Sequence, residues 1–330
     1  MYSKHKIGVV IPALNEELLI KRAVDAIPDY VDKIYIIDDG STDKTLDVIK
    51  EVVTDRATIL VHTTNRGVGA AIVTGYKQAL KDGIEIVAVL AGDNQMDPKH
   101  LPRLLDPIVW NFADYTKGNR LVGEEMRRNM PIWRYFGNSL LTYITKAASG
   151  FYKTCDPQNG YSAISDRALK ALNLDDIYPR YGYCNDLLAK LNVAGCRVTD
   201  VMIPAKYADE KSKIKYGRYI VKMSYLLTKT FIWRLYTKYV VFDFHPLIFF
   251  YIGGAILMSL GSMGMLYSFY AKLFLHTPLF VNGVLSIILI MSGIQSFAFA
   301  IMFDMREQHG DSASAYSTLN GIRSGRIKIK

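Results

Sequence analysis

The chain of 330 residues has only three cysteines, Cys155, Cys184 and Cys196, whose spacing matches neither a disulfide framework nor a zinc site. An odd number of dispersed thiols is typical of proteins in a reducing compartment. The six histidines form no H-E-x-x-H pattern, and there is no G-x-x-x-x-G-K-[ST] loop and no G-x-S-x-G turn. The sequence therefore lacks the signatures of zinc proteases, P-loop proteins and α/β-hydrolases.

Two stretches near the C-terminus have no charged residue. Asp, Glu, Lys and Arg are absent from His245 to Ala271, and again between Lys272 and Asp304. Each stretch exceeds the ~20 residues that a helix needs to cross the hydrocarbon core of a bilayer. The alternative is a pair of buried core helices, which rarely run so long without a charge. Because the link between them is short, we expect a two-helix transmembrane hairpin over residues 245–303.

The distribution of positive charge predicts the orientation of this hairpin. The net charge is +9, and both outer flanks of the hairpin are basic, whereas its link holds only Lys272 and His276. The positive-inside rule places the preceding domain and both chain termini in the cytoplasm. The apolar run that follows Met1 to Lys6 is too short for a signal peptide. The basic residues of the flanks are Lys206, Lys211, Lys213, Lys215, Arg218, Lys222, Lys229, Arg234 and Lys238 upstream, and Arg306, Arg323, Arg326, Lys328 and Lys330 downstream.

Aromatic and aliphatic residues interleave with lysine and arginine between residues 216 and 244. This pattern is typical of helices that lie among lipid headgroups. A nucleic-acid patch is the alternative, but a basic aromatic stretch that leads directly into a membrane hairpin favours lipid, so we expect no nucleic-acid partner. The predicted organisation is a cytosolic domain (1–215), amphipathic interface helices (216–244), the hairpin (245–303) and a cytosolic basic tail (304–330).

The first domain alternates short apolar runs with segments of helical spacing. The predicted strands are residues 7–12, 33–38, 58–62 and 84–90, and the predicted helices between them are residues 16–27, 43–53 and 68–81. Such βα repeats with short connections predict an α/β fold with a mostly parallel sheet and helices on both faces. Ligands of such sheets bind beyond the carboxyl ends of the strands.

All four predicted strands end in polar loops, at residues 13–17, 38–43, 65–69 and 92–98. Taken singly, Asn15 and Thr42 are ordinary helix caps, and Gly40 is an ordinary turn residue. Four acidic or amide-rich loops on one edge of one sheet instead predict a shared ligand site. Carboxylates and amides suit ribose hydroxyls, the edge of a uracil or guanine base, and a divalent cation that prefers oxygen ligands.

The motifs in these loops resemble those of a known enzyme family. Residues 11–16 (IPALNE), 37–43 (IDDGSTD), 65–69 (NRGVG) and 93–98 (DNQMDP) are similar, in this order, to the motifs of family 2 glycosyltransferases of the GT-A fold. Within that family the likeness is greatest to the polyprenyl (dolichyl) phosphate hexose synthases and covers about residues 6–240. The resemblance implies a Rossmann-like GT-A catalytic domain followed by the interface helices and the hairpin.

The resemblance also implies a donor site and a metal site. The implied nucleotide-binding residues are Pro12, Ala13, Asn15, Glu16, Asp38, Asp39, Arg66 and Gly67. Asp93, which is also a catalytic residue by this likeness, and Gln95 belong to the motif that holds Mg²⁺ or Mn²⁺ against the donor diphosphate. The sequence departs from the family's Asp-x-Asp-x-Gln because Ala91 stands at the first position. Asp97 is either an extra ligand or a cap for the helix after Pro98.

Further likenesses imply an acceptor site. Arg120 follows a Gly-Asn pair that is similar to the family's Gly-Ser-Arg, and Arg134, Ser212 and Lys213 are further phosphate-binding candidates. Asp156 begins a stretch that resembles the acceptor loop, and its implied catalytic role is to orient the acceptor or a sugar hydroxyl. Asp186 is implied to orient a sugar hydroxyl. For each cation the alternative is a solvated surface charge.

The implied reaction is an inverting transfer of a hexosyl group from UDP-GlcNAc, UDP-Glc or GDP-Man to dolichyl or polyprenyl phosphate. The acceptor phosphate is already an anion near neutral pH, so no strong general base is required. One alternative is a polysaccharide synthase, although none of the three tryptophans lies in a Gln-x-x-Arg-Trp motif. The other is a membrane-anchored nucleotide-sugar-binding pseudoenzyme, suggested by Ala91. Gly253, Gly254, Gly261 and Gly264 would permit homo-oligomer formation through the hairpin.

Overall fold

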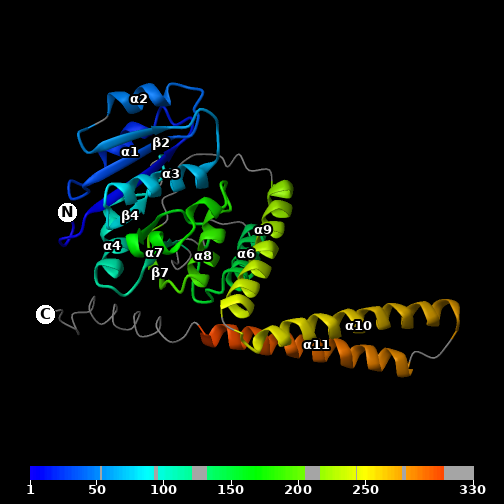
Figure 1. Cartoon of the computed structure of the whole chain (residues 1–330). Coiled ribbons are helices and arrows are strands. Elements are labelled where there is room, and N and C mark those ends of the chain that lie inside the picture. The colour runs from blue at the N-terminus through cyan, green and yellow to red at the C-terminus, as the bar shows by residue number, and fades with distance from the viewer. Residues whose placement is uncertain are drawn as a thin grey trace. The chain divides into compact units, whose positions relative to one another are not determined.

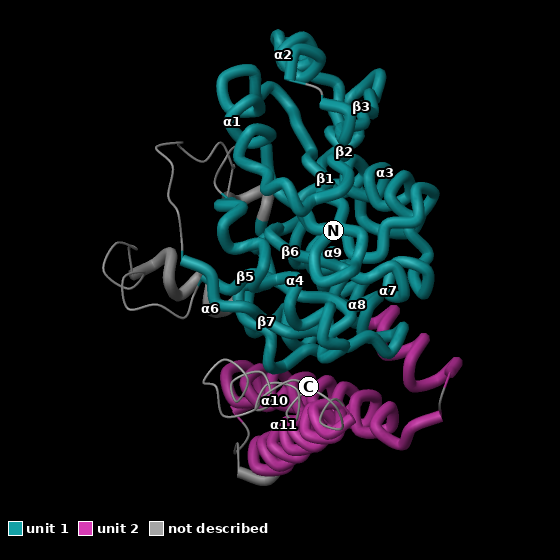
Figure 2. Tube along the Cα trace, turned by 90° about the vertical axis from the view of Figure 1, so that its left-hand side faces the viewer, with its two compact units in different colours: residues 1–231, 311–330 teal, residues 232–310 magenta. Residues whose placement is uncertain are grey.

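The computed structural model describes residues 1–52, 54–92, 96–120, 132–204, 216–242, 244–276 and 280–307. The chain divides into two compact units between Phe231 and Ile232 (Figure 2). Within the described residues, the first unit holds a seven-stranded sheet with its helices, and the second holds two long apolar helices (Figure 1).

The sheet is mostly parallel. Its strands are β1 (Ile7–Ala13), β2 (Lys33–Asp38), β3 (Ala57–Val61), β4 (Ile86–Val89), β5 (Tyr115–Asn119), β6 (Ser162–Ser165) and β7 (Val198–Met202). They lie in the order β3-β2-β1-β4-β6-β5-β7, and only β6 is antiparallel to its neighbours, β4 and β5. The four segments predicted as strands form β1 to β4, which confirms the predicted α/β fold.

Helices cover both faces of this sheet. One face carries α1 (Ile20–Asp25), α2 (Thr45–Glu51) and α4 (Leu101–Val109), and the other carries α3 (Val68–Lys81), α7 (Asp166–Ala171) and α8 (Tyr183–Val193). Two short 3₁₀ turns, η1 (Pro98–His100) and η2 (Leu174–Asp176), precede α4 and α8. Val9 and Ile11 of β1 pack into one core and Val10 into the other, because successive side chains of a strand point to opposite faces.

The first helix is shorter than predicted. It begins at Ile20 instead of residue 16, because the chain after β1 first turns, with Asn15 in the left-handed region (φ +56°) and the backbone N–H of Leu19 donating to the Glu16 carbonyl (3.0 Å). This turn leaves Asn15 and Glu16 at the carboxyl edge of the sheet.

Helices α6 (Ile132–Ser149) and α9 (Tyr216–Tyr236) share a small core of their own. Ala148 of α6 packs there with Met223, Leu226 and Leu227 of α9. On the same helix α9, Val221 and Tyr225 are 71% and 72% exposed. The segment predicted as amphipathic therefore buries one apolar stripe and exposes another.

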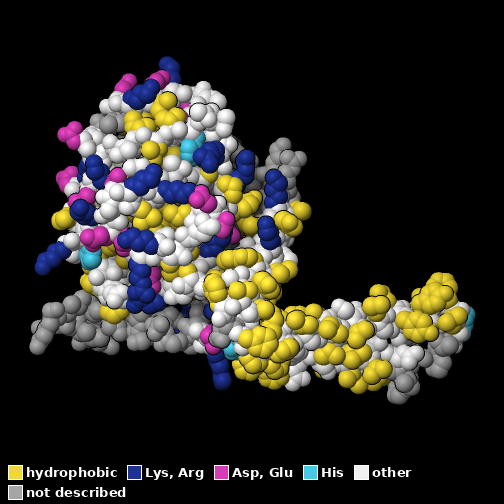
Figure 3. Space-filling view, viewed as in Figure 1, with side chains coloured by type: hydrophobic (Ala, Val, Ile, Leu, Met, Phe, Trp, Pro, Cys, Tyr) yellow, Lys and Arg dark blue, Asp and Glu magenta, His cyan; other side chains and the backbone are white. Residues whose placement is uncertain are grey.

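Helices α10 (Leu247–Phe274) and α11 (Phe280–Glu307) are candidate membrane spans by length and composition. Their most apolar windows have mean hydropathies of 1.8 and 2.2, yet only 22% and 17% of those windows are buried within the protein. Core helices of a soluble domain would be mostly buried. Figure 3 shows that the visible surface of these helices is mostly hydrophobic, whereas Lys, Arg, Asp and Glu are frequent over the sheet domain.

The two apolar helices pack closely on each other through glycine. A Cβ atom on Gly261 would lie 2.8 Å from the Ser286 carbonyl oxygen, and one on Gly254 would lie 3.1 Å from that of Gly293. At Gly264 it would lie 2.5 Å from the Ser286 hydroxyl. Three of the four glycines that suggested self-association thus serve the packing of α10 on α11. The homo-oligomer predicted from the sequence stays a prediction, and these three glycines do not support it.

A fully buried ion pair lies in the second unit. The Arg234 guanidinium donates to both carboxylate oxygens of Asp304, at 2.9 and 2.7 Å, and the two side chains are 0% and 1% exposed. The hydroxyl of Tyr239, in the π-helical turn η3 (Thr237–Phe242), donates to the same carboxylate. Each charge compensates the other, and either one alone would be very unfavourable in an apolar environment.

Candidate active site

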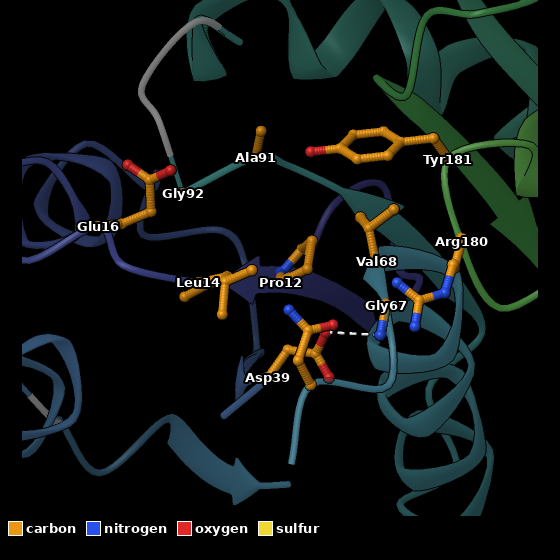
Figure 4. Close-up of a pocket in the computed structure, with 12 residues that line it drawn as sticks. Pro12, Leu14, Glu16, Asp39, Gly67, Val68, Ala91, Gly92, Arg180 and Tyr181 are labelled. Atoms are coloured by element: carbon orange, nitrogen blue, oxygen red, sulfur yellow. Dashed lines mark hydrogen bonds between the residues drawn. The ribbon is translucent and has the colours of Figure 1, made fainter. Parts of the chain in front are cut away.

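A cavity of about 290 Å³ opens at the carboxyl edge of the sheet. The loops after β1, β2, β3 and β4 all contribute to its wall, as expected for a ligand site of a parallel sheet. Figure 4 shows the lining side chains, which are Pro12, Ala13, Leu14, Glu16, Asp39, Asn65, Gly67, Val68, Ala91, Gly92, Arg180 and Tyr181. Five of the predicted nucleotide-binding residues, Pro12, Ala13, Glu16, Asp39 and Gly67, are brought together here.

Asn15 and Asp38 shape the loops beside the cavity and do not line it. The side-chain oxygen of Asn15 accepts from the backbone N–H of Thr42 (2.9 Å), and the Ser41 hydroxyl accepts from the backbone N–H of Asn15 (3.1 Å). The buried Asp38 accepts from the backbone N–H of Ser41 (3.2 Å). These hydrogen bonds join the loops after β1 and β2. The polar groups of Asn15 and Asp38 are therefore partly occupied by partners within the protein.

Asp39 lines the cavity, but its carboxylate is already occupied. One oxygen accepts from His62 Nδ1 (2.7 Å) and the Arg66 backbone N–H (2.9 Å), and the other from the Gly67 backbone N–H (2.8 Å). His62 Nε2 lies 3.0 Å from the Thr74 hydroxyl. Asp39 thus fixes the loop that begins α3. No motif indicated His62, which was noticeable only as the last residue of a predicted strand.

The glycines at the start of α3 allow a distant segment to approach. Gly67 has φ +102°, and a Cβ atom on it would lie 2.5 Å from the Pro179 carbonyl oxygen. A Cβ atom on Gly69 would lie 2.3 Å from the Tyr178 carbonyl oxygen. The backbone N–H of Ala70 donates to the Pro179 carbonyl (3.0 Å). This contact brings residues 178–183 to the cavity wall.

Asp186 supports the same segment. Its carboxylate accepts from the Tyr178 backbone N–H (2.8 Å) and from Lys190 Nζ (2.6 Å), and the residue is 8% exposed. The structure therefore places Asp186 beneath residues 178–183, where it positions the cavity wall, and not among the lining residues.

Arg120 and Asp156 form a pair at the end of β5. Arg120 donates through Nε (2.8 Å) and Nη2 (3.1 Å) to the two carboxylate oxygens of Asp156, whose backbone is left-handed (φ +50°). Beneath them the fully buried Lys117 donates through Nζ to the carbonyl oxygens of Cys155 (2.7 Å) and Asp156. Burial raises the pKa of Asp200 to about 6, and its carboxylate accepts from the Cys155 backbone N–H.

Five predicted site residues lie wholly or partly outside the part of the chain that the structure describes. Asp93, Gln95, Ser212 and Lys213 lie outside the described residues, and the side chain of Arg134 lies outside them too. Asp97, the other candidate near the metal motif, caps η1 by accepting from the Lys99 backbone N–H (3.0 Å).

The described residues of the cavity wall do not form a complete metal site by themselves. No group of three or more His, Cys, Asp or Glu within the described ranges could hold a metal ion. Ala91 presents a methyl group where the family motif has its first carboxylate, and the Asp39 carboxylate is occupied by its own partners. A divalent ion in this site would depend on Asp93 and Gln95 together with the oxygens of the ligand itself.

Comparison with known proteins agrees with this geometry. A family model described as glycosyl transferase family 2 matches residues 8–173. A UDP-N-acetylglucosamine–dolichyl-phosphate N-acetylglucosaminyltransferase of Methanococcus voltae is 31% identical over 218 residues, with 62% of this chain and 86% of that protein covered. A polyprenol monophosphomannose synthase of Mycolicibacterium smegmatis is 29% identical, with 53% and 67% covered.

Solved structures show the same fold. The glucosyl-3-phosphoglycerate synthase of Mycobacterium tuberculosis, in complex with Mn²⁺, UDP and glucosyl-3-phosphoglycerate, superposes with a TM-score of 0.52 at 21% identity, covering 70% of this chain and 80% of that one. The sheet, the cavity at its carboxyl edge and the family match together define a glycosyltransferase of the GT-A fold. The chain belongs to glycosyl transferase family 2.

Proposed function

We propose that this glycosyltransferase moves a hexosyl group from a nucleotide diphosphate sugar to a polyprenyl phosphate such as dolichyl phosphate. The observation that carries the proposal is one chain that combines the cavity at the sheet edge with two apolar helices of membrane-spanning length. The names of relatives from Methanococcus voltae and Mycolicibacterium smegmatis support a polyprenyl-linked acceptor.

The donor occupies the cavity in this proposal. Pro12, Ala13 and Glu16, which line the cavity, would contact the base and ribose, and Ala91 and Gly92 line it just before the metal motif. Mg²⁺ or Mn²⁺, bound at Asp93 and Gln95, would neutralise charge that develops on the leaving diphosphate. A UDP-linked sugar is the first candidate, because the Methanococcus relative is named for a UDP sugar. UDP-GlcNAc, UDP-Glc and GDP-Man are the donors to compare.

The acceptor phosphate meets the sugar beside Arg120, whose side chain is 39% exposed. An oxygen of the phosphate attacks the anomeric carbon while the bond from that carbon to the diphosphate oxygen breaks. The nucleoside diphosphate leaves with the bonding electron pair, and the anomeric configuration inverts. No proton has to be removed from the nucleophile. Asp156 positions Arg120, and Arg134, Ser212 and Lys213 are further candidates for binding the phosphate.

The apolar helices retain the enzyme in the membrane that contains its acceptor. We propose that α10 and α11 span the bilayer, with the basic flanks and both chain termini on the cytoplasmic side. The exposed Val221 and Tyr225 of α9, next to the exposed Lys222, suit the lipid headgroup layer. A lipid phosphate confined to the membrane surface would then meet a tethered active site at high effective concentration.

The test is turnover by the full-length protein in lipid nanodiscs that contain dolichyl phosphate. Each of the three donors is supplied with Mn²⁺, and lipid-linked sugar and released nucleoside diphosphate are measured. We expect one donor to give both products in equal amounts, and Asp93→Asn to abolish them. Absence of product with every donor would overturn the proposal. Donor binding without turnover would favour the nucleotide-sugar-binding pseudoenzyme that Ala91 suggests, and a polymeric product would favour a polysaccharide synthase.

A further inference from the structure

Arg180 and Tyr181 form part of the cavity wall, although no motif in the sequence indicated them. Both belong to the connection between η2 and α8, more than eighty residues beyond β4, the last of the four strands whose loops line the cavity. Figure 4 shows them on the side of the cavity opposite Glu16. The Tyr181 hydroxyl is directed toward Ala91, and the Arg180 guanidinium lies beside Gly67.

The backbone around Arg180 is held firmly, while its side chain is exposed. Four contacts fix the segment: Ala70 N–H to the Pro179 carbonyl (3.0 Å), Tyr178 N–H to Asp186 (2.8 Å), Tyr183 N–H to the Arg180 carbonyl (3.0 Å), and Gly182 against Leu226. The Arg180 side chain makes no hydrogen bond or ion pair with any residue that the structure describes. A guanidinium is thus presented to the cavity from a firmly held backbone, and no described residue pairs with its donors.

A negatively charged donor in this cavity would meet two anionic side chains and one cationic side chain among the described lining residues. Among the described lining residues, Glu16 and Asp39 carry negative charge at neutral pH, and Arg180 carries the positive charge. A diphosphate brings several further negative charges into a partly enclosed space, where they repel one another strongly. Ala91 removes one carboxylate from the usual metal motif, which lessens this repulsion and also weakens any metal site. A guanidinium binds phosphate oxygens through paired N–H donors.

We propose that Arg180 binds the diphosphate of the nucleotide donor and supplies charge compensation that the reduced metal motif provides less well. The inference rests on the proposed function, since it takes the donor to be a nucleotide diphosphate sugar. When the bond to the anomeric carbon breaks, negative charge grows on the diphosphate oxygen that leaves. Arg180 donates hydrogen bonds to the diphosphate oxygens as this charge grows, so it stabilises the transition state as well as the bound donor.

The test is direct binding of nucleotides to the full-length protein in nanodiscs, which needs neither acceptor nor turnover. Affinities for UDP, GDP, UMP and GMP are measured by calorimetry, once with Mn²⁺ and once with EDTA. Arg180→Gln removes the charge and Arg180→Lys retains it. Lys81→Gln is the matched control, because Lys81 is an exposed cation in the last turn of α3, at the opposite end of that helix from Gly67.

The comparison uses whichever of UDP and GDP wild type binds more tightly, in whichever of the two buffers (Mn²⁺ or EDTA) gives the tighter binding. Under these conditions Arg180→Gln should weaken diphosphate binding at least tenfold. Binding of the matching monophosphate should fall by a smaller factor, Arg180→Lys should lie between, and Lys81→Gln should equal wild type. Equal diphosphate affinities of wild type and Arg180→Gln would overturn the role of Arg180 and leave the proposed function standing. Failure of wild type to bind either diphosphate would overturn both.

Discussion

Two arginine–aspartate pairs at opposite ends of β5 have the same atomic pattern. In each, the arginine backbone N–H and Nε donate to one carboxylate oxygen and Nη2 donates to the other. The distances are 3.2, 2.8 and 3.1 Å for Arg120 with Asp156, and 2.9, 3.1 and 3.2 Å for Arg197 with Asp114. Arg120 follows β5 at the carboxyl edge of the sheet, whereas Asp114 precedes β5 and Arg197 precedes the parallel β7.

The surroundings give the two pairs different roles. Arg197 also donates to the carbonyl and the side-chain oxygen of Asn111, at 2.5 and 2.6 Å, so this pair joins two strands to the chain before β5. The Arg120 pair instead involves a loop residue with left-handed backbone, on the edge where parallel sheets bind ligands. The geometry of an ion pair alone therefore does not indicate its function, whereas its place on the sheet does.

The largest effect is expected beneath the pair at the carboxyl edge. Lys117→Met leaves the carbonyls of Cys155 and Asp156 without their buried donor and Asp200 without its nearby cation, so the free energy of unfolding should fall by about 3 kcal/mol. Transferase activity should fall with it. Thr116→Val is the control, because Thr116 is buried on the opposite face and bonds the Leu104 carbonyl. Thermal unfolding and turnover of the full-length protein check both variants.

The next effect separates the two arginines directly. Arg120→Gln should lower turnover about a hundredfold, because the cation proposed to bind the acceptor phosphate is lost. Arg197→Gln should leave turnover within about twofold and lower the free energy of unfolding by about 1 kcal/mol. Steady-state kinetics and unfolding midpoints measured side by side decide this. Similar turnover for the two variants would contradict the division between a ligand edge and a structural edge.

A smaller effect is expected in the pH dependence of stability near the carboxyl edge. Burial raises the pKa of Asp200 from its ordinary 3.8 to about 6. The folded protein thus keeps a proton that the unfolded chain has released, and the stabilisation is lost as the pH rises toward and through 6. Between about pH 5 and about pH 7.5 the loss should be about 1 kcal/mol. Asp200→Asn should abolish this component of the pH profile, and an unchanged profile would refute the assignment.

At the edge of the sheet that holds Asp114 and Arg197, the pH dependence of stability should have the opposite sign. Near neutral pH this effect should be the smallest of the four. Burial alone would raise the pKa of Asp114, but the hydrogen bonds from Arg197 outweigh it and hold that pKa below the ordinary value. Its stabilisation is therefore complete above the ordinary pKa and is lost as the pH falls through the lowered one. In acid unfolding, Asp114→Asn should not show this loss of stability, whereas Asp200→Asn should still show it.

The sequence predicted those parts of the fold whose signals are local. The apolar runs of β1 to β4 and the polar loops that follow them can be read within a few residues, and parallel sheets bring such loops to one edge. The start of α1 was predicted four residues too early, because helical spacing around Glu16 does not show that the chain turns there first. Family resemblance supplied the residues Pro12, Ala13, Glu16, Asp39 and Gly67 that the cavity brings together.

The roles of individual carboxylates could not be predicted, because they depend on partners far along the chain. Asp39 is occupied by His62 and the loop after it, and Asp186 by Lys190 and the backbone of Tyr178. Arg180 reaches the cavity only because Gly67 and Gly69 let its segment approach α3. Contacts of this kind are set by tertiary packing, which leaves no periodic trace in the sequence.

The buried ion pair of Arg234 and Asp304 has a consequence for the synthesis and folding of the chain. Asp304 lies at the far end of the second apolar helix, so it emerges from the ribosome about seventy residues after its partner. Until α11 is complete, Arg234 has no counter-charge there, and a chain shortened before residue 304 would carry a stranded cation. We therefore expect quality-control proteases to remove products truncated within α11.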